Sequence, residues 1–262
     1  MTFAADTYHL FVRWMKKLSR NPILLFFSLF QPIIFLLLFT QLFNKFGLLL
    51  GVNYAAFATA GIVLQNAFSS AFQSGTAMVE DIRSGYLTKI MATTANRSAI
   101  LMGRILSDVF RVFVQSSIIL ILAFAIGVYP ATGALGYLFI ILIVSYFSLA
   151  WSGISLALGL KTKNSETVFG IAGFLTFPLL FMSTALVRQN FMPDWMQAVS
   201  SVNPISFAVN AIRNFVLPPV VSGGAWDWTR IWGDTLIAFG VISLIAVLTL
   251  GATLYQFKKI IT

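Results

Sequence analysis

The sequence predicts an all-α integral membrane protein. Of its 262 residues, 58% are hydrophobic and only 10% are charged, against about 25% charged in an ordinary soluble domain. So few charges could not solvate the exterior of a soluble fold with this much apolar surface. The 26 phenylalanines also exclude an intrinsically disordered chain.

Six stretches of the chain are long and apolar enough to cross a membrane. A bilayer core of roughly 30 Å needs about 20 apolar residues per helix. The predicted spans cover approximately residues 23–43, 53–73, 107–128, 135–160, 167–187 and 231–255. The second is the most polar, and the third continues a helix that begins near Ser98. No low-complexity linker divides the chain, so we expect residues 1–262 to form a single transmembrane domain.

Lysine and arginine near the membrane ends set the orientation of these spans. With the N-terminus placed inside, 13 of the 17 basic residues fall on the cytoplasmic side. The four on the outer side are Lys45, Arg188, Arg213 and Arg230. We therefore expect a multi-pass protein with both termini in the cytoplasm. The basic excess then faces the lipid bilayer, and nucleic acid is not expected as a partner.

An amphipathic segment in residues 1–21 precedes the first span. Apolar residues between Leu10 and Leu18 share one face at helical spacing. The basic residues of the opposite face are Arg13, Lys16, Lys17 and Arg20. This pattern is typical of a helix in the cytoplasmic interface, with its cations near anionic head groups. Two roles fit it, a juxtamembrane anchor or a contact for a cytoplasmic partner.

A second short helix is predicted inside the cytoplasmic loop 74–98. The segment runs from Gly85 to Met91 and includes Tyr86 and Lys89. Within it, three apolar residues recur at i, i+3 and i+4. These residues are Leu87, Ile90 and Met91. The spacing indicates a helix that docks by one side, either on its own subunit or on another protein.

Three charged residues lie one helical turn apart on a single face of the third helix. They are Arg104, Asp108 and Arg111. Charge inside a membrane is expensive, so such residues face protein, water or each other. The sequence leaves two roles open, a neutralised structural cluster or a part of the substrate or coupling machinery.

Polar residues also interrupt the second span. They are Gln65, Asn66, Ser69 and Gln73. They are candidates for the lining of a transport pathway, and hydrogen bonding between neighbouring helices is the alternative.

The segment 188–230 is expected on the outer side, before the last span. It contains Trp195, Trp226 and Trp228 and is interrupted by four prolines. Short amphipathic helices at the outer interface, or re-entrant helices shielded by protein, fit this composition, and so does a passive lid.

The residues needed for several kinds of chemistry are missing from the sequence. It has no cysteine, and His9 is its only histidine, so neither a thiolate nor a multi-histidine metal site is expected. It has no G-x-x-x-x-G-K-[ST] loop for nucleotide phosphates and no G-x-S-x-G elbow. Its eight acidic residues are scattered. We therefore expect neither catalysis nor a cofactor in this chain.

Three groups of motifs follow one another along nearly the whole chain. Arg20-Asn21-Pro22 precedes Gln31-Pro32, and the run from Glu80 to Arg97 precedes Gly103-Arg104. The last group comprises Met192-Pro193-Asp194-Trp195, Asn203-Pro204 and Ala211-Ile212-Arg213. In this order they resemble the motifs of ABC-2 type permease subunits of bacterial and archaeal ATP-binding-cassette exporters, especially the daunorubicin-type drug-resistance branch. The sequence departs from that pattern at Tyr86, often Thr in the family, and at Thr94 or Ala95, where the family usually has Pro.

The resemblance implies a permease half of six helices that pairs with a second, identical half. It implies two separate ATPase subunits, which bind ATP and Mg and dock from the cytoplasm. The segment from Gly85 to Met91 would be the coupling helix that enters a cleft on the ATPase, with the N-terminal helix as a second contact. Changing Leu87 and Ile90 together to glutamate should then uncouple transport without unfolding the spans.

The implied function is outward movement of an amphipathic or hydrophobic substrate, such as a drug, a lipid or a glycoconjugate, across a prokaryotic inner or plasma membrane. Two alternatives remain. A secondary transporter driven by an ion gradient would show inverted repeats or broken helices, which are not found by inspection. A membrane enzyme would need a clustered catalytic set.

Overall fold

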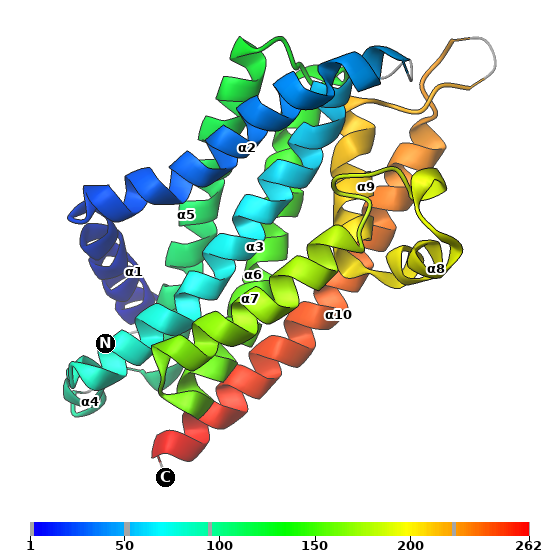
Figure 1. Cartoon of the computed structure of the whole chain (residues 1–262). Helices are drawn as coiled ribbons and strands as arrows, with labels where there is room; N and C mark the ends of the chain where they lie inside the picture. Colours follow the sequence, from blue (N-terminus) through cyan, green and yellow to red (C-terminus); the bar gives the residue numbers. More distant parts are fainter. Residues whose placement is uncertain (1–2, 50–52, 94–95, 222–223, 262) are drawn as a thin grey trace.

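The computed structural model describes residues 3–49, 53–93, 96–221 and 224–261, and over these residues it is a helical bundle (Figure 1). The helices are α1 (Phe3–Ser19), α2 (Pro22–Leu49), α3 (Tyr54–Arg83), α4 (Tyr86–Met91), α5 (Arg97–Ala125), α6 (Gly133–Thr162), α7 (Ser165–Phe181), α8 (Asp194–Val202), α9 (Pro204–Val216) and α10 (Trp228–Ile261), with a short 3₁₀ turn at Gln189–Phe191. Both ends of the chain and α4 lie toward one end of the bundle (Figure 1). The predicted all-α membrane fold is confirmed.

Among the residues that the structure describes, five helices are long and apolar enough to cross a membrane, namely α2, α3, α5, α6 and α10. The fifth predicted span, residues 167–187, corresponds to α7, which has 17 residues and ends at Phe181. Asn203 caps this end of the helix. The side-chain Nδ2 of Asn203 donates to the carbonyl oxygens of Leu179 and Met182, at 2.7 and 3.3 Å, which satisfies acceptors that a helix end leaves open.

Helix α3 is the centre of the bundle and packs against α2, α5, α6, α7 and α9. Small residues let its neighbours approach closely, as is common between membrane helices. The backbone N–H of Gly75 donates to Ser155 Oγ of α6 at 2.9 Å, and Ser155 Oγ donates to the carbonyl oxygen of Phe72 at 2.7 Å. A Cβ atom on Gly75 would collide with the backbone of Ser155. The most polar predicted span is therefore the most enclosed helix.

The predicted loop 74–98 is shorter in the structure. Helix α3 continues through Arg83, so residues 74–83 are helical, and α5 begins at Arg97. Between them, Gly85 has a φ of 68°, a left-handed conformation that favours glycine. The short helix predicted in this loop is confirmed as α4. Thr94 and Ala95, at the position of the family's proline, lie outside the described residues.

The predicted N-terminal amphipathic helix is present as α1 and packs mainly on α5. Leu10 and Trp14 from its apolar face are buried by the protein itself. Gly103 of α5 permits this contact, because a Cβ atom there would lie 2.8 Å from Leu10 Cβ. The apolar face of α1 therefore lies partly against the bundle, while Tyr8 stays 63% exposed.

The short helices predicted before the last span are present as α8 and α9. Helix α9 is enclosed by α3, α6 and α10. Its buried side chains include Ile205, Val209, Ile212 and Phe215. The sequence left open whether these helices lie at the outer interface, are shielded by protein or form a passive lid. Helix α9 is shielded by protein.

Candidate functional site

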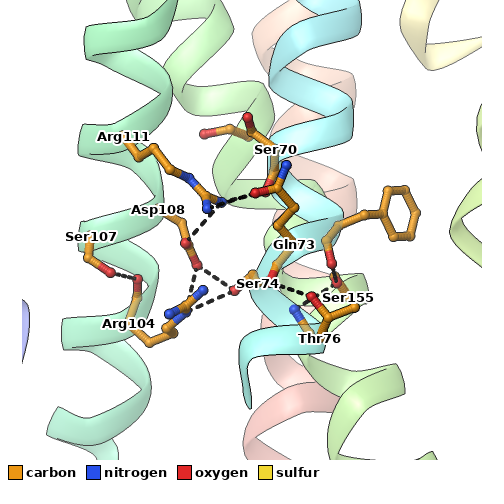
Figure 2. A network of polar contacts seen from close by, with 12 residues as sticks. Ser70, Gln73, Ser74, Thr76, Arg104, Ser107, Asp108, Arg111 and Ser155 are labelled. Carbon is orange, nitrogen blue, oxygen red and sulfur yellow. Dashed lines mark hydrogen bonds and ion pairs between the residues drawn. The ribbon is translucent and has the colours of Figure 1, made fainter. Parts of the chain in front are cut away.

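The three charged residues of α5 meet as the sequence predicts, and all three are buried (Figure 2). Arg104 Nε donates to Asp108 Oδ2 at 3.1 Å. Arg111 Nη2 lies 3.3 Å from the other carboxylate oxygen, Oδ1. One carboxylate is thus held between two guanidinium groups, because the spacings i+4 and i+3 bring all three side chains to one face of the helix.

Helix α3 supplies the rest of this polar network. Ser74 Oγ donates to Asp108 Oδ2, and Gln73 Oε1 accepts a hydrogen bond from Arg111 Nη1 at 3.2 Å. Arg111 Nη2 also donates to the carbonyl oxygen of Ser70 at 2.6 Å (Figure 2). Gln73 therefore belongs to the charged cluster, which the sequence analysis did not foresee.

The network continues to α2 through Gln115, which the sequence analysis missed. Gln115 Oε1 accepts from Ser70 Oγ at 2.7 Å, and its Nε2 donates to Ser28 Oγ at 2.8 Å. A signal was available, because Gln115 lies four residues after Arg111 and so shares the polar face of α5.

The four polar residues of α3 line one small cavity of about 40 Å³ between α2 and α3. They are Gln65, Asn66, Ser69 and Gln73. Asn66 Nδ2 is buried and, within the described residues, has no hydrogen-bond partner. The structure thus brings the candidate pathway residues together on the side of α3 that faces α2.

A larger cavity of about 950 Å³ adjoins the charged cluster and is bordered by α1, α2, α3, α5 and α7. Arg104, Arg111 and Gln73 contribute polar groups to it. Ile23 and Phe27 of α2 and Phe169 of α7 contribute apolar surface. The cavity therefore combines basic and apolar walls.

Helix α1 is joined to α3 and α4 by charged and aromatic contacts. The guanidinium of Arg13 lies 3.1 Å from the centre of the Tyr86 ring and 3.7 Å from Asp81 Oδ2. Lys17 Nζ lies 3.0 Å from Glu80 Oε2 and 3.3 Å from Asp81 Oδ1. Burial raises the pKa of the Tyr86 hydroxyl, and the charge of Arg13 opposes that rise.

Two other basic residues of this segment, Lys16 of α1 and Arg20 just after it, are exposed. Trp14 connects the two polar regions, because the guanidinium carbons of Arg13 and Arg104 lie 4.7 and 4.3 Å from its ring centre.

The predicted docking face of α4 lies against its own subunit. Leu87 is 4% exposed in a cluster that includes Met78 and Phe257, and Ile90 and Met91 pack against that cluster. Lys89 is exposed. The double change of Leu87 and Ile90 to glutamate would therefore also disrupt packing within the chain, so it does not separate a loss of coupling from a loss of packing.

These features define an α-helical multi-pass membrane protein with an enclosed polar interior. In the part of the chain that the structure describes, no three His, Asp or Glu side chains gather as a metal site requires.

Residues 6–217 match the family model for the ABC-2 type transporter, and the chain belongs to this family. It is 31% identical over 98% of its length to a daunorubicin resistance ABC transporter permease protein of Streptomyces coeruleorubidus, of which the match covers 87%. It is 30% identical over 80% of its length to a putative transport permease of Cyanophora paradoxa, covering 74% of that protein. A probable doxorubicin resistance ABC transporter permease protein of Mycobacterium tuberculosis is 23% identical over 86% of this chain, with 83% of that protein covered. The predicted family and its drug-resistance branch are confirmed.

Proposed function

We propose that this chain is the membrane permease subunit of an ABC exporter and that a separate ATPase subunit drives it. The observation that carries this proposal is the attachment of α4. Leu87 anchors this short helix in the bundle. Arg13 of α1 contacts Tyr86 of α4 and pairs with Asp81 of α3. A force on the exposed face of α4 would therefore move α1 and α3 with it.

The energy of ATP reaches the substrate only if the two end states of the permease bind it with different affinities. Helix α4 is suited to couple these states, because Trp14 stacks on both Arg13 beside α4 and Arg104 in the buried network. The permease itself then needs no bond chemistry. Binding of ATP and Mg belongs to the ATPase.

The assembly that we propose contains two ATPase copies and a second, identical permease. Both termini lie in the cytoplasm of a prokaryotic cell, and the protein spans the inner or plasma membrane. The distribution of 13 of the 17 basic residues on the side of the termini supports this orientation. The substrate is amphipathic or hydrophobic and moves outward, which the drug-resistance names of two relatives support.

Affinity capture of the full chain from native membranes, followed by mass identification, tests this proposal. We expect a stoichiometric partner that contains a P-loop, because this chain has none of its own. Capture of the chain without an ATPase, repeated under crosslinking, would overturn the proposal in favour of a secondary transporter driven by an ion gradient.

Changing Thr88 and Lys89 together to glutamate is expected to weaken capture of the ATPase at least about tenfold, the effect of about 1.4 kcal/mol. Both side chains are exposed on α4, so the change alters the exposed face of the helix and spares the buried Leu87. Lys161→Glu is the matched control, since it reverses an exposed charge at the end of α6. Equal capture by the double variant and the control would remove α4 from the ATPase contact.

A further inference from the structure

The cavity beside the charged cluster has unused hydrogen-bond donors. A guanidinium carries five N–H donors. Within the described residues, the hydrogen bonds of Arg104 involve only Nε, which reaches Asp108 and Ser74. Arg111 is 6% exposed, and its buried Nε has no partner in the same part of the chain. Both side chains line the cavity, and the two Nη groups of Arg104 are available there to a ligand, whereas Arg111 Nε is enclosed by protein.

The charge of the cluster is also unbalanced. Two buried guanidinium groups, of Arg104 and Arg111, share the single carboxylate of Asp108. At the rim, Lys17 already pairs with Glu80, and Arg83 adds a further positive charge. An uncompensated charge in a low-dielectric site is costly. An anion in the cavity would relieve that cost.

The opposite walls of the cavity are apolar and continuous with the outer surface of the bundle. Ile23, Phe27 and Phe169 line it and are 69%, 63% and 73% exposed. They belong to α2 and α7, two apolar helices that both pack on α3. A ligand held by the arginines would therefore extend its other end across apolar surface toward the membrane.

We propose that this cavity binds an amphipath with a negatively charged head group, a phosphate or a carboxylate. The head group lies on Arg104 and Arg111, because guanidinium donors match the oxygens of these anions in pairs. The apolar tail lies along Ile23, Phe27 and Phe169. Binding of this amphipath is inferred from the cavity alone. Its assignment as the transported substrate rests on the proposed function.

Native mass spectrometry of the full chain in a neutral detergent tests the binding step. The probes are dioleoyl phosphatidic acid and dioleoyl phosphatidylcholine, which differ in head-group charge and share their tails. We expect the phosphatidic acid to bind at least about tenfold more tightly, as charge-assisted hydrogen bonds predict. Equal binding of the two lipids would overturn the proposal.

Two variants locate the site. Arg111→Gln should weaken binding of phosphatidic acid about tenfold. Arg111 also donates hydrogen bonds to Ser70 and Gln73, so its replacement can disturb the core. A second variant that leaves the core unchanged is therefore required. Phe169→Glu places a negative charge beside the cavity on an exposed position, and Phe177→Glu makes the same change on α7 outside the lining. We expect Phe169→Glu to weaken binding of phosphatidic acid more than Phe177→Glu does. An equal or smaller loss in Phe169→Glu would also overturn the proposal.

The source of the ligand is settled by two further measurements. An anionic phospholipid that stays bound through purification would identify a bilayer lipid as the occupant and remove the substrate assignment. A chain purified without lipid that takes up dodecyl phosphate supports a transported amphipath, and inorganic phosphate alone should not compete. In the assembled transporter, dodecyl phosphate should then raise ATP hydrolysis at least about twofold, relative to an equal concentration of neutral dodecyl maltoside. If dodecyl phosphate does not change the rate of ATP hydrolysis, the substrate assignment is wrong and the proposed exporter function is unaffected. If no ATPase subunit is found, the proposed exporter function is wrong and the binding of an anionic amphipath is unaffected.

Discussion

Asp108→Asn is expected to destabilise the protein by about 3–5 kcal/mol, because it leaves two buried guanidinium groups without their carboxylate. Arg104 and Arg111 contact different oxygens of Asp108, at 3.1 and 3.3 Å. Asparagine keeps the shape of the side chain but supplies no charge and only one acceptor oxygen. The free energy of unfolding, followed by titration with a denaturing detergent, is the measurement.

Asp234→Asn is the matched control for this change. Its carboxylate is 36% exposed and lies 4.0 Å from Arg230. It also accepts a hydrogen bond from Asn214 Nδ2 at 2.7 Å, which the amide oxygen of asparagine can still accept. The loss of its charge should therefore cost about 0–1 kcal/mol. Equal destabilisation by the two variants would show that Asp108 is not the centre of the cluster. Replacing all three residues, Asp108→Leu with Arg104→Met and Arg111→Met, should regain part of the lost stability, since apolar side chains carry no desolvation cost.

The charged cluster could be predicted from the sequence because its geometry is local. Arg104, Asp108 and Arg111 belong to one helix, and helical spacing alone brings them to the same face. Their partners on α3, Ser74 and Gln73, depend on how two helices pack, which no local pattern encodes. Small polar residues in a membrane helix indicate a contact but do not identify the residue across it.

The bounds of α3 and the environment of α4 show the same limit. The charges of Glu80 and Asp81 suggest a loop after the second span, but Lys17 of α1 compensates them and the helix continues. Likewise, the spacing of Leu87 and Ile90 predicts an apolar face on α4 without indicating what covers it. In the structure that cover is the chain's own cluster around Met78.

Gly75→Val is expected to destabilise the bundle by at least about 1–3 kcal/mol, which is the usual cost of overpacking. The added side chain would collide with the backbone of Ser155, which cannot rotate away as a side chain can. Gly75 faces α6 at a close crossing of the two helices, where its N–H donates to Ser155 Oγ. The same contact is tight from the other side, because a Cβ atom on Gly159 would lie 2.6 Å from the carbonyl oxygen of Gly75. Neither helix can yield without moving the buried polar network, since Ser74 adjoins Gly75 and donates to Asp108.

Gly170→Val separates this packing effect from the effect of valine on a helix. Gly170 lies inside α7, and a Cβ atom there meets no described atom within 4 Å. Both variants change the intrinsic helix propensity equally, so the difference between their free energies of unfolding measures the crossing of α3 and α6 alone. A difference near zero would mean that α3 and α6 do not approach as closely as the glycines allow. A large difference would confirm that α3 and α6 cross too closely at Gly75 to admit a larger side chain.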